Sequence, residues 1–259
     1  MRITDARTGR STEIHPGRAG LLRVTVRAGQ PGQPFFLEDL RALLTADLLA
    51  RIVEATGPQV ETRLSLPEAG DDRVTALLRD ADLLGIRRPA DITSTTGGPA
   101  DLEIAARPGA GDDQEGTPLV TIGAVVPAGR ADPSTAAGPL GSIPLDGLEP
   151  LAVRLALLGH AHEAPARLSA ESLADAQATL TRWRAVVADL ARFPSQPLVA
   201  DAVRVAFDGL ADDLDAMPAL QALHDLEKRT ELPPGARFET YLRVDQVLAL
   251  ELGREIGRQ

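Results

Sequence analysis

The hydrophobic residues of this chain follow two periodicities, and the change between them most constrains the fold. Residues 21–26 and 59–66 alternate apolar and polar side chains, as half-buried strands do. Residues 37–55 and 72–84 repeat leucines at helical spacing, and Gly85 follows the second segment as a helix stop. This strand–helix–strand–helix order predicts a parallel sheet with helical crossovers, because parallel neighbours need a long connection.

The middle of the chain breaks this pattern. Residues 93–118 and 127–142 are rich in proline and glycine, which is typical of loops. Short apolar runs at residues 102–104 and 119–126 predict two further strands.

From residue 147 onward the apolar spacing is helical. Ser169 is a suitable N-cap for a long helix, and Asp215 for a later helix that tolerates Pro218 in its first turn. We therefore expect an α/β protein. A reduced Rossmann-like (HUP) parallel-sheet domain would span residues 1–142, and an all-helical bundle domain residues 146–259.

Charge and composition exclude several classes of function. The formal net charge of −10 disfavours nucleic acid, because an acidic protein repels phosphates. The absence of cysteine excludes disulfides, thiolate zinc sites and cysteine nucleophiles. The first residues lack the apolar core of a secretory signal, and no apolar run approaches the roughly 18 residues that span a bilayer. We expect a cytoplasmic protein that does not contact membranes.

Several segments resemble the cysteinyl-tRNA synthetase family. Residues 2–9 (RITDARTG) resemble the family's opening LxLYDTxTG, and residues 149–158 (EPLAVRLALL) its DPLALRLxLL helix. Residues 207–220 and 241–253 are similar to two later helices. The family includes the mycothiol-pathway ligase that joins cysteine to a glucosamine-inositol. The resemblance implies a vestigial class I synthetase-like Rossmann domain with a helical domain behind it.

The catalytic signatures of that family have no counterpart here. Along the resemblance, Arg27 stands at the zinc-binding cysteine, and Phe36 and Asp39 fall on the two histidines of the HIGH signature. The loop expected to carry the KMSKS lysines offers only Arg130, because Lys228 is the only lysine of the chain. The resemblance therefore implies no catalytic residue, no cofactor-binding residue, no metal ligand and no cofactor.

The histidines are expected to have no special role. On a helix, His160 and His162 would point about 200° apart and would not chelate one metal ion. His224 suits a packed or surface position, and His15 a loop without partners. Trp183 lies on the apolar face of its helix and is predicted to be a core residue.

The acidic and glycine-rich clusters are also expected to have structural or surface roles rather than to bind ligands. Helix capping is expected for Asp212, Asp213 and Asp215, in preference to a cation site. Residues 94–98 lack the lysine and the following helix of a phosphate loop. A solvated surface is expected for three acidic residues of the middle loop, namely Asp112, Asp113 and Glu115.

One aromatic pair suggests a specific hypothesis. If Phe35 and Phe36 face the cleft in which the family binds its nucleotide, their rings would plug it with apolar surface. Finding both rings on the outer surface would contradict this hypothesis.

Three functions remain open. The leading hypothesis is a non-catalytic relative of cysteinyl-tRNA synthetase with a binding, assembly or regulatory role, acting with a protein partner or as a homo-oligomer. The first alternative is a repurposed cysteine or aminoacyl ligase that acts on a small molecule or carrier. The second is a tRNA-binding regulator. Residues 146–259 carry 12 basic and 18 acidic residues, which argues against tRNA unless Arg182, Arg184 and Arg192 form a basic stripe.

Overall fold

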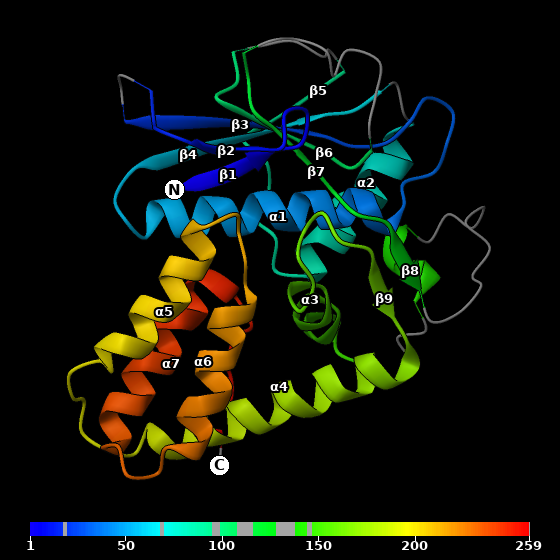
Figure 1. Cartoon of the computed structure of the whole chain (residues 1–259). Helices are drawn as coiled ribbons and strands as arrows, with labels where there is room; N and C mark the ends of the chain where they lie inside the picture. The colour runs from blue at the N-terminus through cyan, green and yellow to red at the C-terminus, as the bar shows by residue number, and fades with distance from the viewer. Residues whose placement is uncertain are drawn as a thin grey trace.

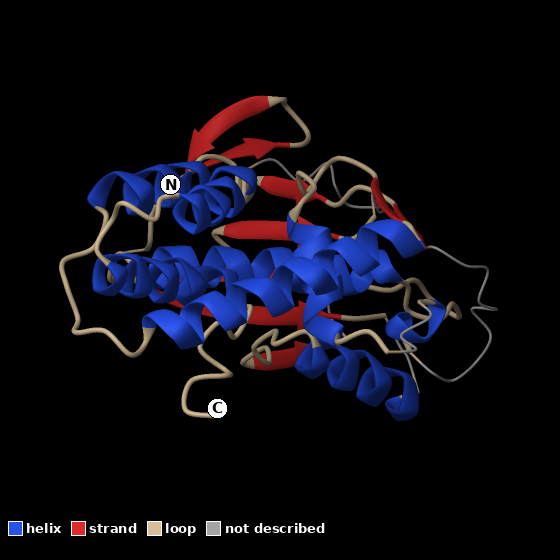
Figure 2. Cartoon of the chain, turned by 90° about the horizontal axis from the view of Figure 1, so that it is seen from below, coloured by secondary structure: helices blue, strands red, loops and turns tan. Residues whose placement is uncertain are grey.

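The protein consists of a parallel sheet, a long helix beneath it and a group of helices below that helix (Figure 1). This computed structural model describes residues 1–17, 20–67, 70–94, 99–107, 116–127, 138–143 and 147–258. The helices lie between the viewer and the sheet when the molecule is seen from below (Figure 2). The Rossmann-like sheet with associated helices confirms the predicted fold class.

The central sheet has the strand order β5-β4-β3-β6-β7, and all neighbouring strands run parallel. Its strands are β3 (Leu21–Arg27), β4 (Gln59–Ser65), β5 (Asp91–Thr93), β6 (Leu102–Ala105) and β7 (Leu119–Thr121). The strands predicted at residues 21–26, 59–66 and 102–104 are confirmed. Sequence periodicity missed β5, because three residues are too few to show an alternation.

The two crossover helices lie on the same face of the sheet. They are α1 (Leu37–Glu54), between β3 and β4, and α2 (Asp71–Leu83), between β4 and β5. Right-handed crossovers that step in one direction place their helices on one face, whereas the steps to β6 and β7 lead the other way. The described residues of those later connections, 94–101 and 106–118, contain no helix.

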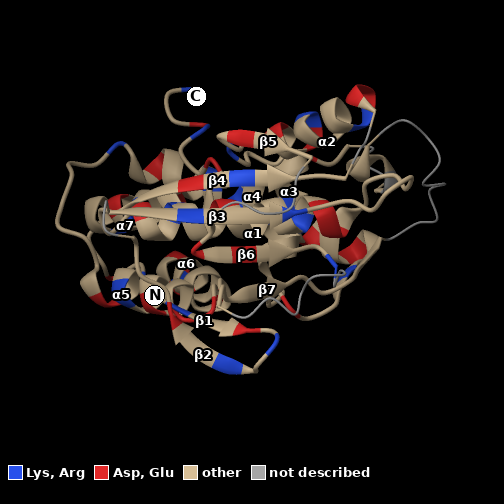
Figure 3. Cartoon of the chain, turned by 90° about the horizontal axis from the view of Figure 1, so that it is seen from above, with Lys and Arg blue, Asp and Glu red and all other residues tan. Residues whose placement is uncertain are grey.

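The opposite face of the sheet is polar for this reason. In β3, Leu22, Val24 and Val26 are buried, while Arg23 and the other alternate residues are only half-buried. The two charge signs mix on that face along β3, β4 and β6 (Figure 3). A sheet face that no helix covers is exposed to solvent and therefore needs polar side chains. The alternation of apolar and polar residues along the strands places polar side chains on that face.

Helix α1 is buried on all sides rather than on the single leucine face that its spacing predicts. Its buried residues include polar ones such as Arg41, Thr45 and Asp47. The sheet covers one side, and the helical part of the chain, notably α5 (Ala200–Ala211) and α7 (Pro234–Leu248), packs on the other. Each buried polar group on α1 therefore needs an internal partner.

The remaining helices are α3 (Pro150–Leu158), α4 (Ala170–Leu190) and α6 (Met217–Lys228), with a short 3-10 helix η1 (Pro139–Ser142) before them. Ser169 caps α4 as predicted, because its side-chain oxygen accepts the Ser172 N–H at 3.0 Å. Asp215 accepts the Met217 N–H at the start of α6. Trp183 is fully buried, so its prediction as a core residue is confirmed.

Two predictions about the strands are wrong. Residues 119–126 do not form one strand, because the chain leaves the sheet after β7 and forms β8 (Val125–Pro127). Strand β8 pairs in parallel with β9 (Ala166–Leu168), so the half expected to be all-helical contains a strand. An antiparallel hairpin of β1 (Arg2–Asp5) and β2 (Arg10–Glu13), also not predicted, lies beside β7.

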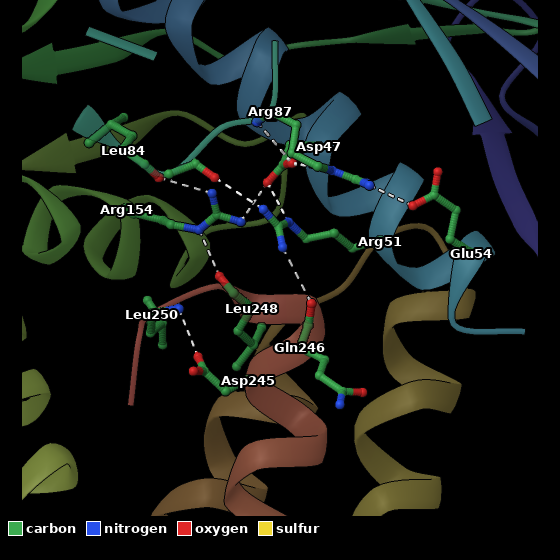
Figure 4. A network of polar contacts seen from close by, with 11 residues as sticks. Asp47, Arg51, Glu54, Leu84, Arg87, Arg154, Asp245, Gln246, Leu248 and Leu250 are labelled. Atoms are coloured by element: carbon green, nitrogen blue, oxygen red, sulfur yellow. Dashed lines mark hydrogen bonds and ion pairs between the residues drawn. The ribbon is translucent and has the colours of Figure 1, made fainter. Parts of the chain in front are cut away.

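A buried ion pair ties α1 to the helical part of the chain (Figure 4). Arg154 of α3, with no exposed surface, donates to Asp47 Oδ2 at 2.8 Å and to the carbonyls of Leu84 and Leu248. Burial alone would raise the pKa of Asp47, but Arg154 and Arg51 outweigh burial and hold it below its ordinary value. The EPLAVRL segment therefore supplies the arginine that joins α1, α3 and α7.

In the described part of the chain, none of the helices has the length and apolar character needed to cross a membrane.

Candidate functional site

The candidate site lies at the carboxyl edge of the sheet between β3 and β6. Chain connections leave these two neighbouring strands in opposite directions, which makes this the topological switch point. Open parallel sheets bind their ligands at such a point. Gly29 after β3, the N-terminus of α1 at Leu37, and Arg107 after β6 meet there.

Asp39 occupies the position at which an anionic ligand would meet the start of α1. Its two carboxylate oxygens accept the N–H groups of Gly29 and Phe36, each at 2.7 Å, and Arg107 lies 3.6 Å away. Backbone N–H groups at a helix N-terminus are a ready site for phosphate or carboxylate groups. Burial raises the pKa of Asp39, and the two N–H groups and Arg107 oppose this shift. A side chain of the protein itself therefore fills the anion position.

The two phenylalanines close the same edge. Phe35 is buried against Gly29, where a Cβ atom would lie 2.6 Å from the Phe35 ring. Phe36 is half-buried, and the Arg107 guanidinium lies 4.5 Å from the centre of its ring. The two rings are therefore not both on the outer surface, so the structure does not contradict the plug hypothesis.

Glu38 contributes a second carboxylate to this edge of the sheet. One of its oxygens accepts the Val125 N–H at 2.9 Å, and the other lies 3.5 Å from Arg107. The described edge thus holds two carboxylates against one guanidinium. The backbone N–H groups of Gly29 and Phe36 already donate to Asp39, the second in the capping-box contact between Asp39 and the N-cap residue of α1.

The other signature positions do not converge on this edge. Arg27 pairs with Glu103 at 3.6 Å through the half-exposed face of the sheet, so its side chain does not line the strand end. Arg130, residues 95–98 and the three acidic residues Asp112, Asp113 and Glu115 lie outside the described residues.

The structure corrects two expectations about the histidines. His160 and His162 do not lie on a helix, because α3 ends at Leu158, and His162 is buried rather than at the surface. His15 has a partner after all, since its ring nitrogen lies 3.2 Å from Glu13 Oε2. His224 is packed edge-on to Trp183, and burial lowers its pKa.

The aspartates before α6 each have a different partner. Asp212 pairs with Arg2 at 3.2 Å, and Asp213 Oδ1 accepts the Thr4 N–H at 2.7 Å. Asp212 is the C-cap residue of α5, and Asp215 Oδ1 accepts the Met217 N–H next to Ala216, the N-cap residue of α6. Capping is wrong for Asp213, which, like Asp212, contacts the N-terminal strand β1.

The arginines suggested for tRNA do not form a stripe. Arg184 is buried and donates to the carbonyls of Leu250 and Glu251. Arg182 is paired with Glu227 at 2.7 Å, and Arg192 lies on the surface beside Asp189. One of the three is buried and another is paired with a carboxylate, so these positions do not form a basic stripe.

A shallow hollow of about 480 Å³ lies at the neighbouring strand ends. It is lined by Leu66, Pro67, Gly70, Val74, Ile92, Thr93 and Ser94. Its described walls carry no acidic or basic side chain, and their polar side chains are the hydroxyls of Thr93 and Ser94.

Comparison with known proteins gives a partial sequence match. The L-cysteine:1D-myo-inositol 2-amino-2-deoxy-alpha-D-glucopyranoside ligase of Micrococcus luteus is 47% identical over 77 residues, which is 30% of this chain and 17% of that protein. The same ligases of Streptomyces scabiei and Kribbella flavida are 44% and 34% identical over 41% of this chain. Over part of its length the chain is related to these cysteine ligases.

The relatives are much longer than the matched segments. This chain spans only 17 to 26% of the length of these three mycothiol cysteine ligases, which form a cysteinyl-tRNA synthetase-like class I family. The resemblance seen in the sequence is thereby confirmed at partial coverage. No protein-family profile matches the chain.

A solved structure supports the fold independently. A Campylobacter jejuni protein, provisionally assigned as an arginyl-tRNA synthetase, superposes with a TM-score of 0.50 at 9% identity. The superposition covers 93% of this chain and 92% of that one. At this identity the likeness concerns the fold alone, and it agrees with a synthetase-like arrangement of sheet and helices.

Proposed function

We propose that this protein is a non-catalytic member of the cysteine ligase lineage, with a binding or assembly role. The observation that carries the proposal is Asp39, whose carboxylate takes the two N–H groups at the switch point. A bound nucleotide would have to displace this carboxylate and bring its own negative charge beside it and Glu38. Two unit charges 4 Å apart repel by about 4 kcal/mol at an effective dielectric of 20.

The chemistry of adenylate formation also lacks its usual parts here. Stabilising the charge that develops on a phosphate requires preplaced donors. Phe36 and Asp39, which fall on the signature histidines, offer an aromatic ring and a carboxylate. Arg107, the positive group among the described residues at this edge, is already engaged by Glu38, Asp39 and the Phe36 ring.

A thermal-shift experiment tests the loss of the ligand site. The chain is heated with ATP plus cysteine, and separately with a cysteinyl-sulfamoyl-adenylate analogue, both at millimolar concentration. The Micrococcus luteus ligase serves as the positive control. A ligand that binds only the folded state raises the melting temperature, so we expect a shift for the control and none for this chain. A concentration-dependent shift of this chain would favour a repurposed ligase instead.

In this proposal the chain binds either another protein or a second copy of itself. Large apolar side chains are exposed on the connection between α4 and α5 and on α5 itself, namely Phe193, Leu198 and Val205. A groove of about 620 Å³ separates this connection from α7, with Leu198, Leu242 and Arg243 among its walls.

Light scattering at micromolar concentration gives the oligomeric state. A mass above one chain that Val205→Asp reduces would support self-association through this region.

A further inference from the structure

One cluster of ligating side chains lies away from the switch point. His162 and Glu163 come from the loop between α3 and β9, and Asp213 from the turn between α5 and α6. One ligand atom from each of the three lies within 4.8 Å of the other two. Nothing in the switch-point chemistry uses these residues, so their convergence calls for a separate explanation.

His162 is aimed into the cluster with an unsatisfied nitrogen. Its side chain is only 8% exposed, and Nε2 has no hydrogen-bond partner. Nδ1 lies 3.4 Å from the Thr121 carbonyl oxygen, to which it can donate in one tautomer, and 3.5 Å from Glu163 Oε2. That tautomer leaves a lone pair on Nε2, which faces Asp213 Oδ1 at 3.5 Å. Buried polar atoms are almost always paired, so this orphan points to an absent ligand.

Asp213 is held rigidly beside this nitrogen. Its backbone lies in the left-handed region, with φ +60, and its N–H donates to the Arg2 carbonyl at 2.9 Å. Oδ1 accepts the Thr4 N–H at 2.7 Å. A non-glycine residue in this conformation is strained and persists where its surroundings demand it. The β1 strand therefore fixes one carboxylate against His162.

We propose that His162, Glu163 and Asp213 form a site for a zinc-like divalent transition metal. Imidazole and carboxylate ligands suit zinc, with metal–ligand distances of about 2.0–2.2 Å. A tetrahedral ion at such distances brings its ligand atoms to roughly 3.5 Å from one another. The cluster needs only a modest contraction, which Glu163 can supply because 57% of its side chain is exposed. Water would complete the coordination.

Charged side chains around the cluster act on a bound cation in both directions. The Arg41 guanidinium lies nearby, buried among the carbonyls of Gly123, Ala161 and Ala164. It repels a cation, whereas the carboxylates of Glu163 and Asp213 attract one. The sum favours a divalent cation, and the imidazole selects a transition metal over magnesium or calcium.

Such a metal would link segments that are distant in the sequence. Asp213 holds β1, and the His162 carbonyl accepts a hydrogen bond from the Gly123 N–H between β7 and β8. An ion bound to both would stabilise the folded state and raise its melting temperature. This inference does not depend on whether the switch point is active.

Titration of the full chain with zinc chloride tests the proposal. The protein is first treated with a chelator and dialysed, and zinc binding is then followed by calorimetry and by thermal shift. We expect one zinc ion per chain and a higher melting temperature. We also expect at least tenfold weaker binding in His162→Gln and in Asp213→Asn, the latter keeping an oxygen for Thr4. His15→Gln, which removes an exposed histidine elsewhere, should bind like the wild type.

Absence of zinc binding by the wild type, or undiminished binding by His162→Gln and Asp213→Asn, would overturn the site. If the buried variants fail to fold, Glu163→Gln gives the answer, because its exposed side chain tolerates replacement. Zinc affinity equal to wild type in folded Glu163→Gln would then reject the three-residue site. Substituting cobalt for zinc adds a spectroscopic check, since visible bands should appear in the wild type and weaken in the variants.

Discussion

At the scale of single residues, two buried aspartates explain much of the structure, and they do so in opposite ways. Burial raises the pKa of Asp39, which receives two backbone N–H groups, whereas arginines lower the pKa of Asp47 despite burial. The position of Asp39 on a signature histidine follows from the sequence resemblance. Its hydrogen bonds do not, because they depend on how the glycine turn after β3 folds back onto α1.

Replacing Asp39 by asparagine should destabilise the protein. Asparagine keeps one acceptor oxygen, so one of the Gly29 and Phe36 N–H groups would face an amide N–H group. An unpaired buried donor costs about 1–3 kcal/mol, and chemical denaturation should show a loss of that size. Glu38→Gln is the matched control, because it also weakens the contact with Arg107 but keeps its oxygen for Val125. Equal losses in the two variants would contradict this role of Asp39.

The ion pair of Asp47 predicts how stability depends on pH. Because the pKa of Asp47 is lower in the folded state than in the unfolded state, its stabilisation is present above the ordinary aspartate pKa of about 3.9. That stabilisation is lost as the pH falls through the folded-state pKa. Arg154→Met should cost about 3 kcal/mol at pH 7, and the deficit should shrink below about pH 4. Chemical denaturation of wild type and variant at pH 7 and below about pH 4 measures this deficit in the free energy of unfolding. Arg192→Met is the control, because Arg192 is exposed and its replacement should not change that free energy measurably.

At the scale of elements, tertiary contacts decide where a strand ends. Residues 119–126 look like one strand because most of them are apolar. The chain nevertheless turns at Gly123, whose N–H donates to the His162 carbonyl at 2.8 Å. Local periodicity identified the long helices and central strands, since each has enough residues for a pattern. It could not identify β5, β8 or β9, which are three residues long and depend on their partners.

Gly123→Ala tests this explanation of the break. An added Cβ would lie 2.5 Å from the Glu163 carbonyl oxygen and closer still to that of Ala164, so backbone would have to move. Overpacking of this kind costs about 1–3 kcal/mol. Gly17→Ala is a suitable control, because its Cβ would meet Leu21 O at an ordinary 3.5 Å. Similar melting temperatures for the two variants would show that the close approach at Gly123 is unimportant.

At the scale of the whole molecule, the two predicted domains share their interior. A single hydrophobic cluster of described residues runs from Ile3 to Leu252, and α1 lies between the sheet and the lower helices. The periodicities located the change from mixed to helical structure near residue 147. They could not show that α1 would be covered on both sides, because its leucine pattern describes one face while Arg41 and Asp47 find their partners in the helical part.

This shared interior predicts one cooperative unfolding transition. If residues 1–142 and 146–259 were independent, far-ultraviolet and near-ultraviolet signals would report separate transitions. The Trp183 environment in the helical part should instead be lost together with the sheet. Calorimetry should give equal calorimetric and van't Hoff enthalpies. Two resolved transitions would contradict the dependence of the two parts on each other.

The proposed non-catalytic role is tested most directly by amino-acid-dependent exchange of pyrophosphate into ATP. This assay detects the reversible formation of an aminoacyl adenylate, and it is run with cysteine and with each other amino acid in turn. Because Asp39 fills the anion position at the switch point, we expect no exchange above the enzyme-free blank, while the Micrococcus luteus ligase exchanges with cysteine. Exchange by this chain that requires one particular amino acid would contradict the non-catalytic role.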